Sequence, residues 1–443
     1  MESSRVPSLT MHSDEKTEHS ASTVEVECGE RDRKQVRDAG RLVYWIFLLH
    51  GVSILLQFNV VVTASSFFEQ RFAATPYAKT FQNFFSIAYN IPNLVSLTLA
   101  LLFTNRGFFQ SRILCAISIN VVVMMLLALS ARTAALGEDE LYFRVVLGLV
   151  AVTGASSALY QNGVFALVSN FPKIYVQAVM SGQGVAGAGI ALAQLATTAG
   201  AGSGSSLTKA DLDQSAFWYF IIAFAIAFAS LIGDLVLIRL PFYKHYTSEK
   251  AVRDKLDPEA VPPTLRTVFK KIYPYAFAAA YAFLVTIAVF PSITTQILSV
   301  TPSASRFHRN DVFLAFHFLL FNVGDLLGRA IPGLQWMYTR RAWVLVVGAL
   351  ARTAFVPLFM VCNVMSPGRK MPTVINSDAA YFILVVLLGL SNGWVVSLAM
   401  MAAPNLGSVK PHEQNMIGSM MVTCLIAGLV VGSALSFPLR SAV

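Results

Sequence analysis

The chain has 443 residues, of which 55% are hydrophobic and only 13% are charged. Because an ordinary soluble domain carries roughly 25% charged residues, this composition excludes a soluble protein and indicates one embedded in a membrane. The net charge of +9 does not indicate a nucleic-acid-binding protein. The basic residues lie between the apolar runs, where the enrichment of cytoplasmic loops in Lys and Arg explains them.

Residues 1–40 are polar and mixed in charge, and they lack the apolar core of a signal peptide. This composition predicts a disordered tail. Apolar runs of about 20 residues then recur to the C-terminus, and each is long enough to cross ~30 Å of hydrocarbon as a helix. The fold class that we expect is all-α, with eleven transmembrane helices at residues 41–68, 80–104, 110–132, 141–170, 177–200, 216–240, 270–298, 311–333, 341–364, 379–403 and 414–438.

Basic residues mark one side of the predicted helices. They precede the first span and return after the sixth, in a segment that includes Lys244 and Arg253. Because cytoplasmic connections are enriched in Lys and Arg, we expect the N-terminus and the segment 241–269 to be cytoplasmic. This longest connection divides the chain into a predicted six-helix bundle, 41–240, and a five-helix bundle, 270–443. Two bundles joined in this way are expected to rock about a central site.

The first span carries Gln57 and Asn59 between apolar residues. Amides inside a helical bundle hydrogen-bond either a ligand or a neighbouring helix, and for Asn59 both alternatives stay open. Phe58 and Val62 lie one turn apart, so they are predicted to present one apolar surface.

Pro92 in the second span and Pro291 in the seventh each remove a backbone hydrogen bond and predict a kink. Breaks of this kind often lie beside the binding site of a transporter, so both prolines are candidate hinges. Phe290 adjoins the second break. Phe85, two turns before Pro92, contacts either a ring-shaped solute or simply other core residues.

The fourth span places two adjacent amides, Gln161 and Asn162, near its middle. Buried amides are costly unless they are hydrogen-bonded, and Gln161 faces either a solute or another helix. The fifth span opens with MSGQGVAGAG. Its glycines predict close helix packing, and they do not form a phosphate-binding loop because no strand precedes them.

The eighth span contains Asp325 and Arg329. A charged residue at the centre of a bilayer costs about 2.5–3.5 kcal/mol on insertion scales, so both side chains are expected to face a pathway or a partner. Their spacing places them on one helix face, and Asn322 extends this stripe. The stripe binds a polar solute or forms a gate. The alternatives are a structural ion pair, or the Gly-x-x-x-Asp-x-x-Gly-Arg pattern that major facilitators carry in a cytoplasmic loop.

No group of residues indicates catalysis. The four cysteines are scattered without the spacing of a metal site or a disulfide framework. We therefore expect no enzymatic activity, no cofactor and no metal. The expected partners are a solute and the lipid bilayer, without nucleic acid or an obligate protein partner. An integral-membrane enzyme or scaffold would need a catalytic group of residues or a large soluble domain.

Several segments, taken in chain order, resemble those of the equilibrative nucleoside transporters. The likeness covers residues 45–438 and includes LLQFNVVVTASSFF, SSALYQNGVFAL with MSGQG, FLLFNVGDLLGRAI, RTAFVPLFMVCNV and KPHEQNMIGSMMVTCLIAGLVVGSALSF. The resemblance implies eleven helices in a six-plus-five, major-facilitator-like arrangement. It also implies that the protein moves nucleosides, and sometimes nucleobases, down their gradient by alternating access.

The resemblance also implies roles for single residues. Asp325 and Arg329 would bind ribose hydroxyls or govern the gate, and Asn322 would support Asp325. Gln161 would face the base. The apolar walls would be formed by Phe58, Val62, Phe85 and Phe290. The chain departs from the family pattern at Gln57-Phe58, at Val62 and at Asn162-Gly163, which leaves base selectivity open.

The function that we predict is facilitative nucleoside transport, in the plasma membrane or in a vacuolar or endosomal membrane. The alternative is a proton-coupled transporter of the major facilitator superfamily. Members of that superfamily have twelve spans and a signature loop after the second span. The corresponding loop here, FTNRGFFQSR, lacks the Asp of that signature.

Overall fold

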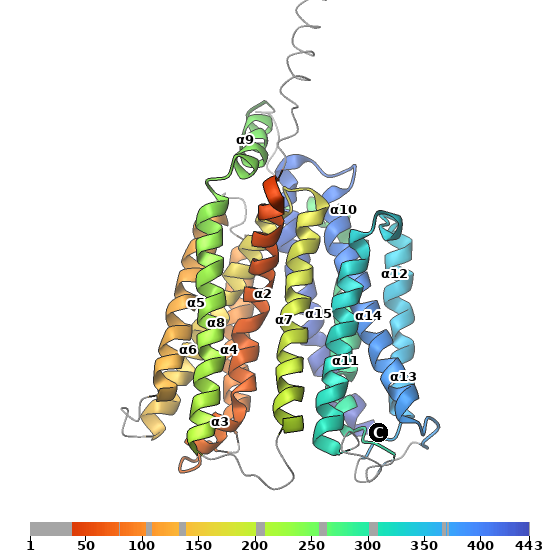
Figure 1. The fold of residues 1–443 in the computed structure, drawn as a ribbon. Helices are drawn as coiled ribbons and strands as arrows, with labels where there is room; N and C mark the ends of the chain where they lie inside the picture. The colour runs from red at the N-terminus through yellow and green to blue at the C-terminus, as the bar shows by residue number, and fades with distance from the viewer. Residues whose placement is uncertain are drawn as a thin grey trace, which may run out of the picture. The chain divides into compact units, whose positions relative to one another are not determined.

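The computed structural model describes residues 38–78, 80–102, 109–132, 139–200, 209–256, 264–300, 309–365, 369 and 372–442. These residues are almost entirely helical (Figure 1), and the strand-like pairings among them are two isolated bridges. Most of the predicted tail, 1–40, lies outside the described residues.

Eleven helical segments of the described chain are long and apolar enough to span a membrane. The all-α fold class with eleven spans is therefore confirmed. The segments are α2 (Leu42–Thr63), α4 (Phe81–Leu102), α5 (Phe109–Arg132), α6 (Asp139–Val168), α7 (Lys173–Gly200), α8 (Lys209–Leu237), α10 (Leu265–Val289), α11 (Asn310–Ala330), α12 (Ala342–Ala351) continued by α13 (Phe355–Met360), α14 (Asp378–Ala402) and α15 (Gln414–Ala442).

The prolines act differently from one another. Helix α4 continues through Pro92, whereas α10 ends at Val289, directly before the extended Phe290 and the cis Phe290–Pro291 peptide bond. A short 3-10 turn also separates α12 from α13, close to Pro357. Because proline has no backbone N–H to donate, neither Pro291 nor Pro357 can complete the hydrogen-bond pattern of its helix.

The predicted cytoplasmic loop 241–269 contains a helix, α9 (Pro241–Leu256). This helix is too polar to span, and its aromatic residues anchor it. Phe242 is buried, and its ring packs against Phe171 and Tyr175 at the junction of α6 and α7. The helix therefore marks one end of the molecule, the upper end in Figure 1, which is called the α9 end below.

A buried polar chain continues from α9 into the membrane-spanning helices. The Tyr243 hydroxyl donates to Gln110 Oε1 at 3.0 Å, and Gln110 Nε2 donates to Asp234 Oδ2 at 2.5 Å. Asp234 faces His50 at 3.6 Å, and the His50 ring hydrogen-bonds Tyr160 at 2.7 Å. The intramembrane Asp234 is thus held by a local set of partners.

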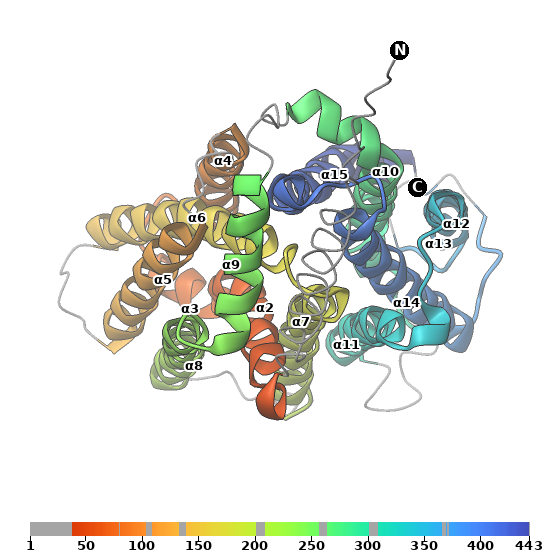
Figure 2. The same cartoon turned by 90° about the horizontal axis from the view of Figure 1, so that it is seen from above.

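The spanning helices pack as two neighbouring groups (Figure 2). The N-terminal group is α2 and α4–α8, in which α2 packs on α6, α7 and α8. The C-terminal group is α10–α15, in which α11 packs on α14 and α10 on α15. The groups meet mainly where α7 contacts α11 and where α6 contacts α15. Their motion as separate bundles remains a prediction.

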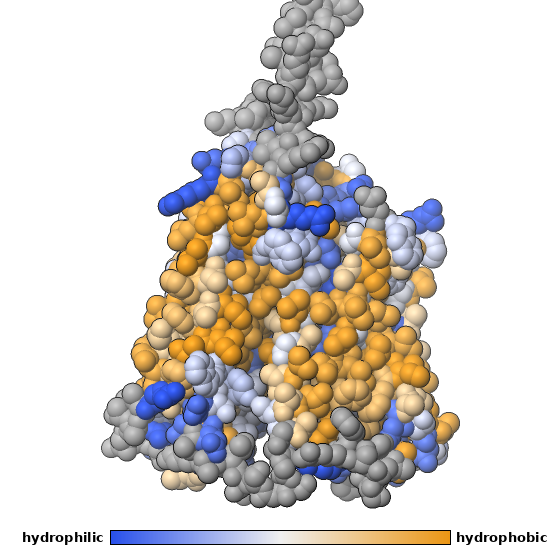
Figure 3. All heavy atoms as spheres, in the orientation of Figure 1, coloured by the Kyte–Doolittle hydropathy of each residue, from blue (hydrophilic) through white to orange (hydrophobic). Residues whose placement is uncertain are grey.

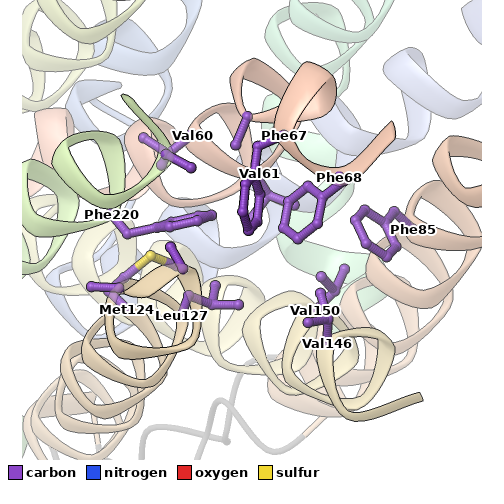
Figure 4. Packing of buried hydrophobic residues seen from close by; sticks show 14 of the residues in the cluster. Val60, Val61, Phe67, Phe68, Phe85, Met124, Leu127, Val146, Val150 and Phe220 are labelled. Atoms are coloured by element: carbon purple, nitrogen blue, oxygen red, sulfur yellow. The ribbon is translucent and has the colours of Figure 1, made fainter. Parts of the chain in front are cut away.

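Aromatic and aliphatic side chains fill the N-terminal group away from the α9 end (Figure 4). Phe68, in the short helix α3 (Ser65–Arg71), is fully buried, and its ring centroid lies 5.1 Å from that of Phe85. The fully buried Phe220 of α8 closes the other side of this cluster. The spanning helices also expose a belt of apolar side chains (Figure 3), as contact with lipid requires.

Candidate functional site

Helices α11 and α14 pack with their backbones in close approach. Gly324 and Gly328 of α11 face Gly389 and Gly393 of α14, and a Cβ at any of the four would collide with a carbonyl oxygen of the facing helix. This small-residue seam is typical of tightly packed membrane helices. It brings Asn392 of α14 beside the charged stripe of α11.

The predicted ion pair forms within α11. Arg329 Nε donates to Asp325 Oδ2 at 2.6 Å, and Asn392 Nδ2 donates to Asp325 Oδ1 at 2.7 Å. Both charged residues are buried, with 5% and 6% of their surfaces exposed. Each carboxylate oxygen therefore has a donor, and the two charges balance each other in a region from which water is largely excluded.

Arg329 also reaches across to the N-terminal group. Its Nη1 donates to the carbonyl oxygen of Met180 at 3.2 Å and to Gln183 Oε1 at 3.1 Å, both on α7. One guanidinium thus joins a carboxylate of its own helix to two acceptors of the other helix group. This geometry suits a contact that forms in one state of the protein and breaks in another.

The glycines of α7 make this approach possible. Gly184 lies against Leu326 and Arg329, and a Cβ at Gly187 would collide with Asn322 Oδ1. Gly182 approaches the backbone of α2 instead, whereas Gly189 has no atom near its missing side chain. The predicted packing role is confirmed for Gly182, Gly184 and Gly187, but it is wrong for Gly189.

The polar candidate residues differ in whether their side chains hydrogen-bond the backbone of their own helix. Asn59 Nδ2 donates to Leu55 O at 2.6 Å, and Asn322 Nδ2 donates to Phe318 O at 2.8 Å, each one turn back. Gln161 is half-buried and makes no hydrogen bond with the described residues. Of these three amides, it is the one with neither its nitrogen nor its oxygen engaged by the described residues.

Asn162, the neighbour of Gln161, connects helices. It is fully buried, and its Oδ1 accepts from Ser419 of α15 at 3.2 Å and from Arg112 of α5 at 3.5 Å. Of the two adjacent amides, Asn162 therefore bridges helices and Gln161 does not.

The apolar candidates also occupy different surroundings. Phe58 is half-buried and stacks on Tyr89 with ring centroids 4.0 Å apart, and Phe290 stacks on Phe321 at the same separation. Val62 is 54% exposed. Phe85 is only 5% exposed within the aromatic cluster of Figure 4, which favours its alternative role in core packing.

The candidate residues fall into two sets, one on each helix group. Asn322, Asp325 and Arg329 lie on α11, and Phe290 stacks on Phe321 of the same helix. Phe58, Asn59, Val62 and Gln161 lie on α2 and α6. No hydrogen bond joins the two sets among the described residues, so their convergence on one solute remains a proposal.

Sequence reasoning missed several partners of the ion pair. Gln183 and Asn392 are polar residues in apolar runs, and a search for amides could have found both. Arg352 lies near the end of a span in the sequence, where either extension toward the membrane surface or a local partner would explain it, and its exposure of only 1% contradicts the first explanation. The signal was present, since an intramembrane arginine requires partners.

Comparisons with known proteins agree with the resemblance. The family model described as nucleoside transporter matches residues 147–263 and 255–441. Human equilibrative nucleoside transporter 1 is 28% identical, over 92% of this chain and 99% of its own length. Mouse equilibrative nucleoside transporter 2 is 30% identical, over 90% of this chain and 97% of its own.

Among solved structures, the fucose:proton symporter of E. coli aligns over 90% of this chain and 94% of its own, with 15% identity and a TM-score of 0.48. The identification depends on the sequence comparisons. Since the family model covers more than half of the chain and a relative with 30% identity covers nearly all of it, this chain belongs to the nucleoside transporter family.

Proposed function

We propose that this protein is a facilitative transporter that carries nucleosides or nucleobases across a membrane, down their gradient, by alternating access. The observation that carries the proposal is the Asp325–Arg329 pair. In a member of this family it is buried at the junction of two helix groups, with Arg329 bound to both. The expected location is the plasma membrane or a vacuolar or endosomal membrane, with a cytoplasmic N-terminus.

The contacts between the helix groups favour a state that is closed at the α9 end. Asn170 hydrogen-bonds Asn415 there, and the Lys173 ammonium lies 3.2 Å from the centroid of the Tyr338 ring. Arg329 adds its bonds to α7 deeper in the molecule. Opening this end requires these contacts to break, together with the hydrogen bond from Ser419 of α15 to Asn162 of α6.

The chemistry of the two residue sets suits a nucleoside. The solute is neutral, so Asp325 and Arg329 offer an acceptor and a donor to ribose hydroxyls without leaving a net buried charge. Gln161 has an unused amide that can read a polar base edge. Phe58 and Phe290 offer apolar faces to the base.

The remaining candidates contribute less directly. Asn59, Val62 and Asn322 are proposed to support the other members of the two sets, and Pro92 and Pro291 are kept as proposed hinges. Phe85 is assigned to packing because of its burial.

Proton coupling is the less favoured mechanism. A proton-coupled carrier needs a carboxylate that gains and loses a proton during the cycle. Both oxygens of Asp325 are engaged, one by Arg329 and one by Asn392, so a proton would have to displace one of these donors.

Uptake by the purified protein in liposomes tests the proposal. Labelled uridine or adenosine should enter until it reaches equilibrium, and unlabelled nucleosides should compete, while empty liposomes show neither effect. Accumulation above equilibrium under an imposed pH gradient would favour the proton-coupled mechanism instead. Absence of uptake for every nucleoside and nucleobase would contradict the proposal.

A further inference from the structure

Arg352 is a second buried arginine in the C-terminal group, and the proposed function gives it no role. It opens the 3-10 turn η7 (Arg352–Ala354) between α12 and α13 and is 1% exposed. It makes no ion pair with a carboxylate among the described residues. A buried cation without a counter-charge beside it is costly, so its charge must be balanced through other groups.

The guanidinium is held by three oxygen atoms. Nη1 donates to the Leu388 carbonyl at 3.0 Å and to the Ser391 hydroxyl, both on α14. Nη2 donates to Thr286 Oγ1 of α10 at 2.6 Å. The first two bonds fasten the turn to α14, whereas the third leads toward the ion pair of α11.

The donors and acceptors of this path can be followed from Arg352 to Asp325. Thr286 Oγ1 accepts from Arg352, and its own proton has two acceptors in reach, Asn392 Oδ1 at 2.9 Å and the Ala282 carbonyl of the same helix at 2.8 Å. With its oxygen on this donor, Asn392 presents Nδ2 to Asp325 Oδ1 at 2.7 Å. When Thr286 donates to Asn392, every donor points from Arg352 toward Asp325, and two opposite charges are joined through two neutral side chains.

We propose that Arg352 is a positioning residue for transport. Through Thr286 and Asn392 it keeps Asp325 compensated while Arg329 exchanges its partners. The proposal rests on the proposed function, because it assumes that Arg329 releases α7 during the cycle. A nucleoside hydroxyl or a new protein contact that draws Arg329 away would otherwise leave a buried carboxylate short of a donor, which is strongly unfavourable.

The location of the path supports this role. Arg352, Thr286, Asn392 and Asp325 all belong to the C-terminal group, on η7, α10, α14 and α11. Separation of the two helix groups breaks the bonds of Arg329 to α7 but leaves this path intact. Arg352 therefore stays connected to Asp325 in every state of the cycle. The bonds from Arg329 to the acceptors on α7, by contrast, are lost when the groups separate.

Variants of Thr286 separate this role from simple fastening of the turn. Thr286→Val keeps the shape of the side chain and removes the hydroxyl, while Arg352 retains both partners on α14. Thr286→Ser restores the hydroxyl. Ser391→Ala is the matched control, because it removes a hydrogen bond of Arg352 that lies outside the path.

The measurement is the initial rate of labelled uridine uptake into liposomes over a range of concentrations, with the melting temperature of each purified variant. Thr286→Val should lower the maximal rate about tenfold, the effect of losing one buried hydrogen bond to a charged network, with little change in KM. Arg352→Met should behave alike. Thr286→Ser and Ser391→Ala should retain the rate of the parent protein.

A parent-like maximal rate for Thr286→Val would overturn the inference, as would an equal loss in Ser391→Ala. If Arg352→Met fails to fold, the Thr286 and Ser391 variants still decide the matter. If the parent protein transports no nucleoside, the proposed function is refuted. If the parent transports and Thr286→Val reaches the same rate, only the role of Arg352 is refuted.

Discussion

Asp325 and Arg329 are best understood by comparison with a surface pair of the same spacing. Glu140 and Arg144 also form an i, i+4 ion pair, at 2.6 Å, but they are largely exposed to the surroundings. Exposed pairs of this kind contribute about 0–1 kcal/mol, whereas removing one partner of a buried pair costs about 3–5 kcal/mol. The same sequence pattern therefore has different consequences at the two positions.

We expect Asp325→Asn and Arg329→Ala each to reduce nucleoside uptake by at least ~100-fold, because each leaves a buried group unpaired. Glu140→Gln, the surface control, should keep uptake within about twofold of the parent protein, as expected of an exposed pair. Uptake per folded molecule, with folding checked by gel filtration, is the measurement. Full uptake by both α11 variants would show that transport does not require the Asp325–Arg329 pair.

The adjacent amides Gln161 and Asn162 allow a second comparison at this scale. We expect Gln161→Ala to raise KM and to alter the ratio of KM values for adenosine and uridine, because its amide is not used inside the protein. Asn162→Ala should instead lower the melting temperature, since Asn162 bridges to α15. Competition uptake checks the first effect and thermal unfolding checks the second. A change in KM ratio for Asn162→Ala and a lower melting temperature for Gln161→Ala would contradict these roles.

Helix α7 shows how small residues control the approach of two elements. Its contact with α11 depends on Gly184 and Gly187, which leave room for Arg329 and Asn322. A larger residue here would hold the two helix groups apart at the point where Arg329 binds α7. The glycines thereby connect helix packing to the transport cycle.

We expect Gly187→Ala to lower the maximal uptake rate about tenfold, because the added methyl group displaces Asn322 and over-packs the contact. Gly189→Ala is the matched control on the same helix, since nothing lies near its missing side chain. It should transport normally and be slightly more stable, as alanine favours helix over glycine. Equal activity of the two variants would show that the α7–α11 approach does not limit transport.

At the scale of the whole molecule, hydropathy predicted the eleven spans because membrane insertion depends mainly on the length and polarity of each segment. Helix rotation is set by packing between segments distant in the chain, and that information is absent from the local pattern. This is why Gln161 and Asn162 could not be distinguished, and why the core residue Phe85 was also a candidate for the cavity wall. The charged stripe on α11 was predictable, but its partners on α7 and α14 were not.

The rocking of the two helix groups is a property of the whole molecule, and a cross-link tests it. Asn170 and Asn415 hydrogen-bond each other across the groups at the α9 end. We expect the double variant Asn170→Cys/Asn415→Cys, with the native cysteines replaced by serine, to lose uptake when a short thiol cross-linker joins the pair. Reduction of the cross-link should restore it, because alternating access requires this contact to open.

The matched control lies at the same end but within one group. Lys271 Nζ and Glu413 Oε1 are 2.7 Å apart, and both belong to the C-terminal group. Cross-linking Lys271→Cys/Glu413→Cys should leave uptake at its value before cross-linking, since these residues are expected to move together. Undiminished uptake by the linked Asn170–Asn415 variant would mean that transport proceeds without opening of the α9 end. The two helix groups would then have to be regarded as a single rigid body with a different pathway.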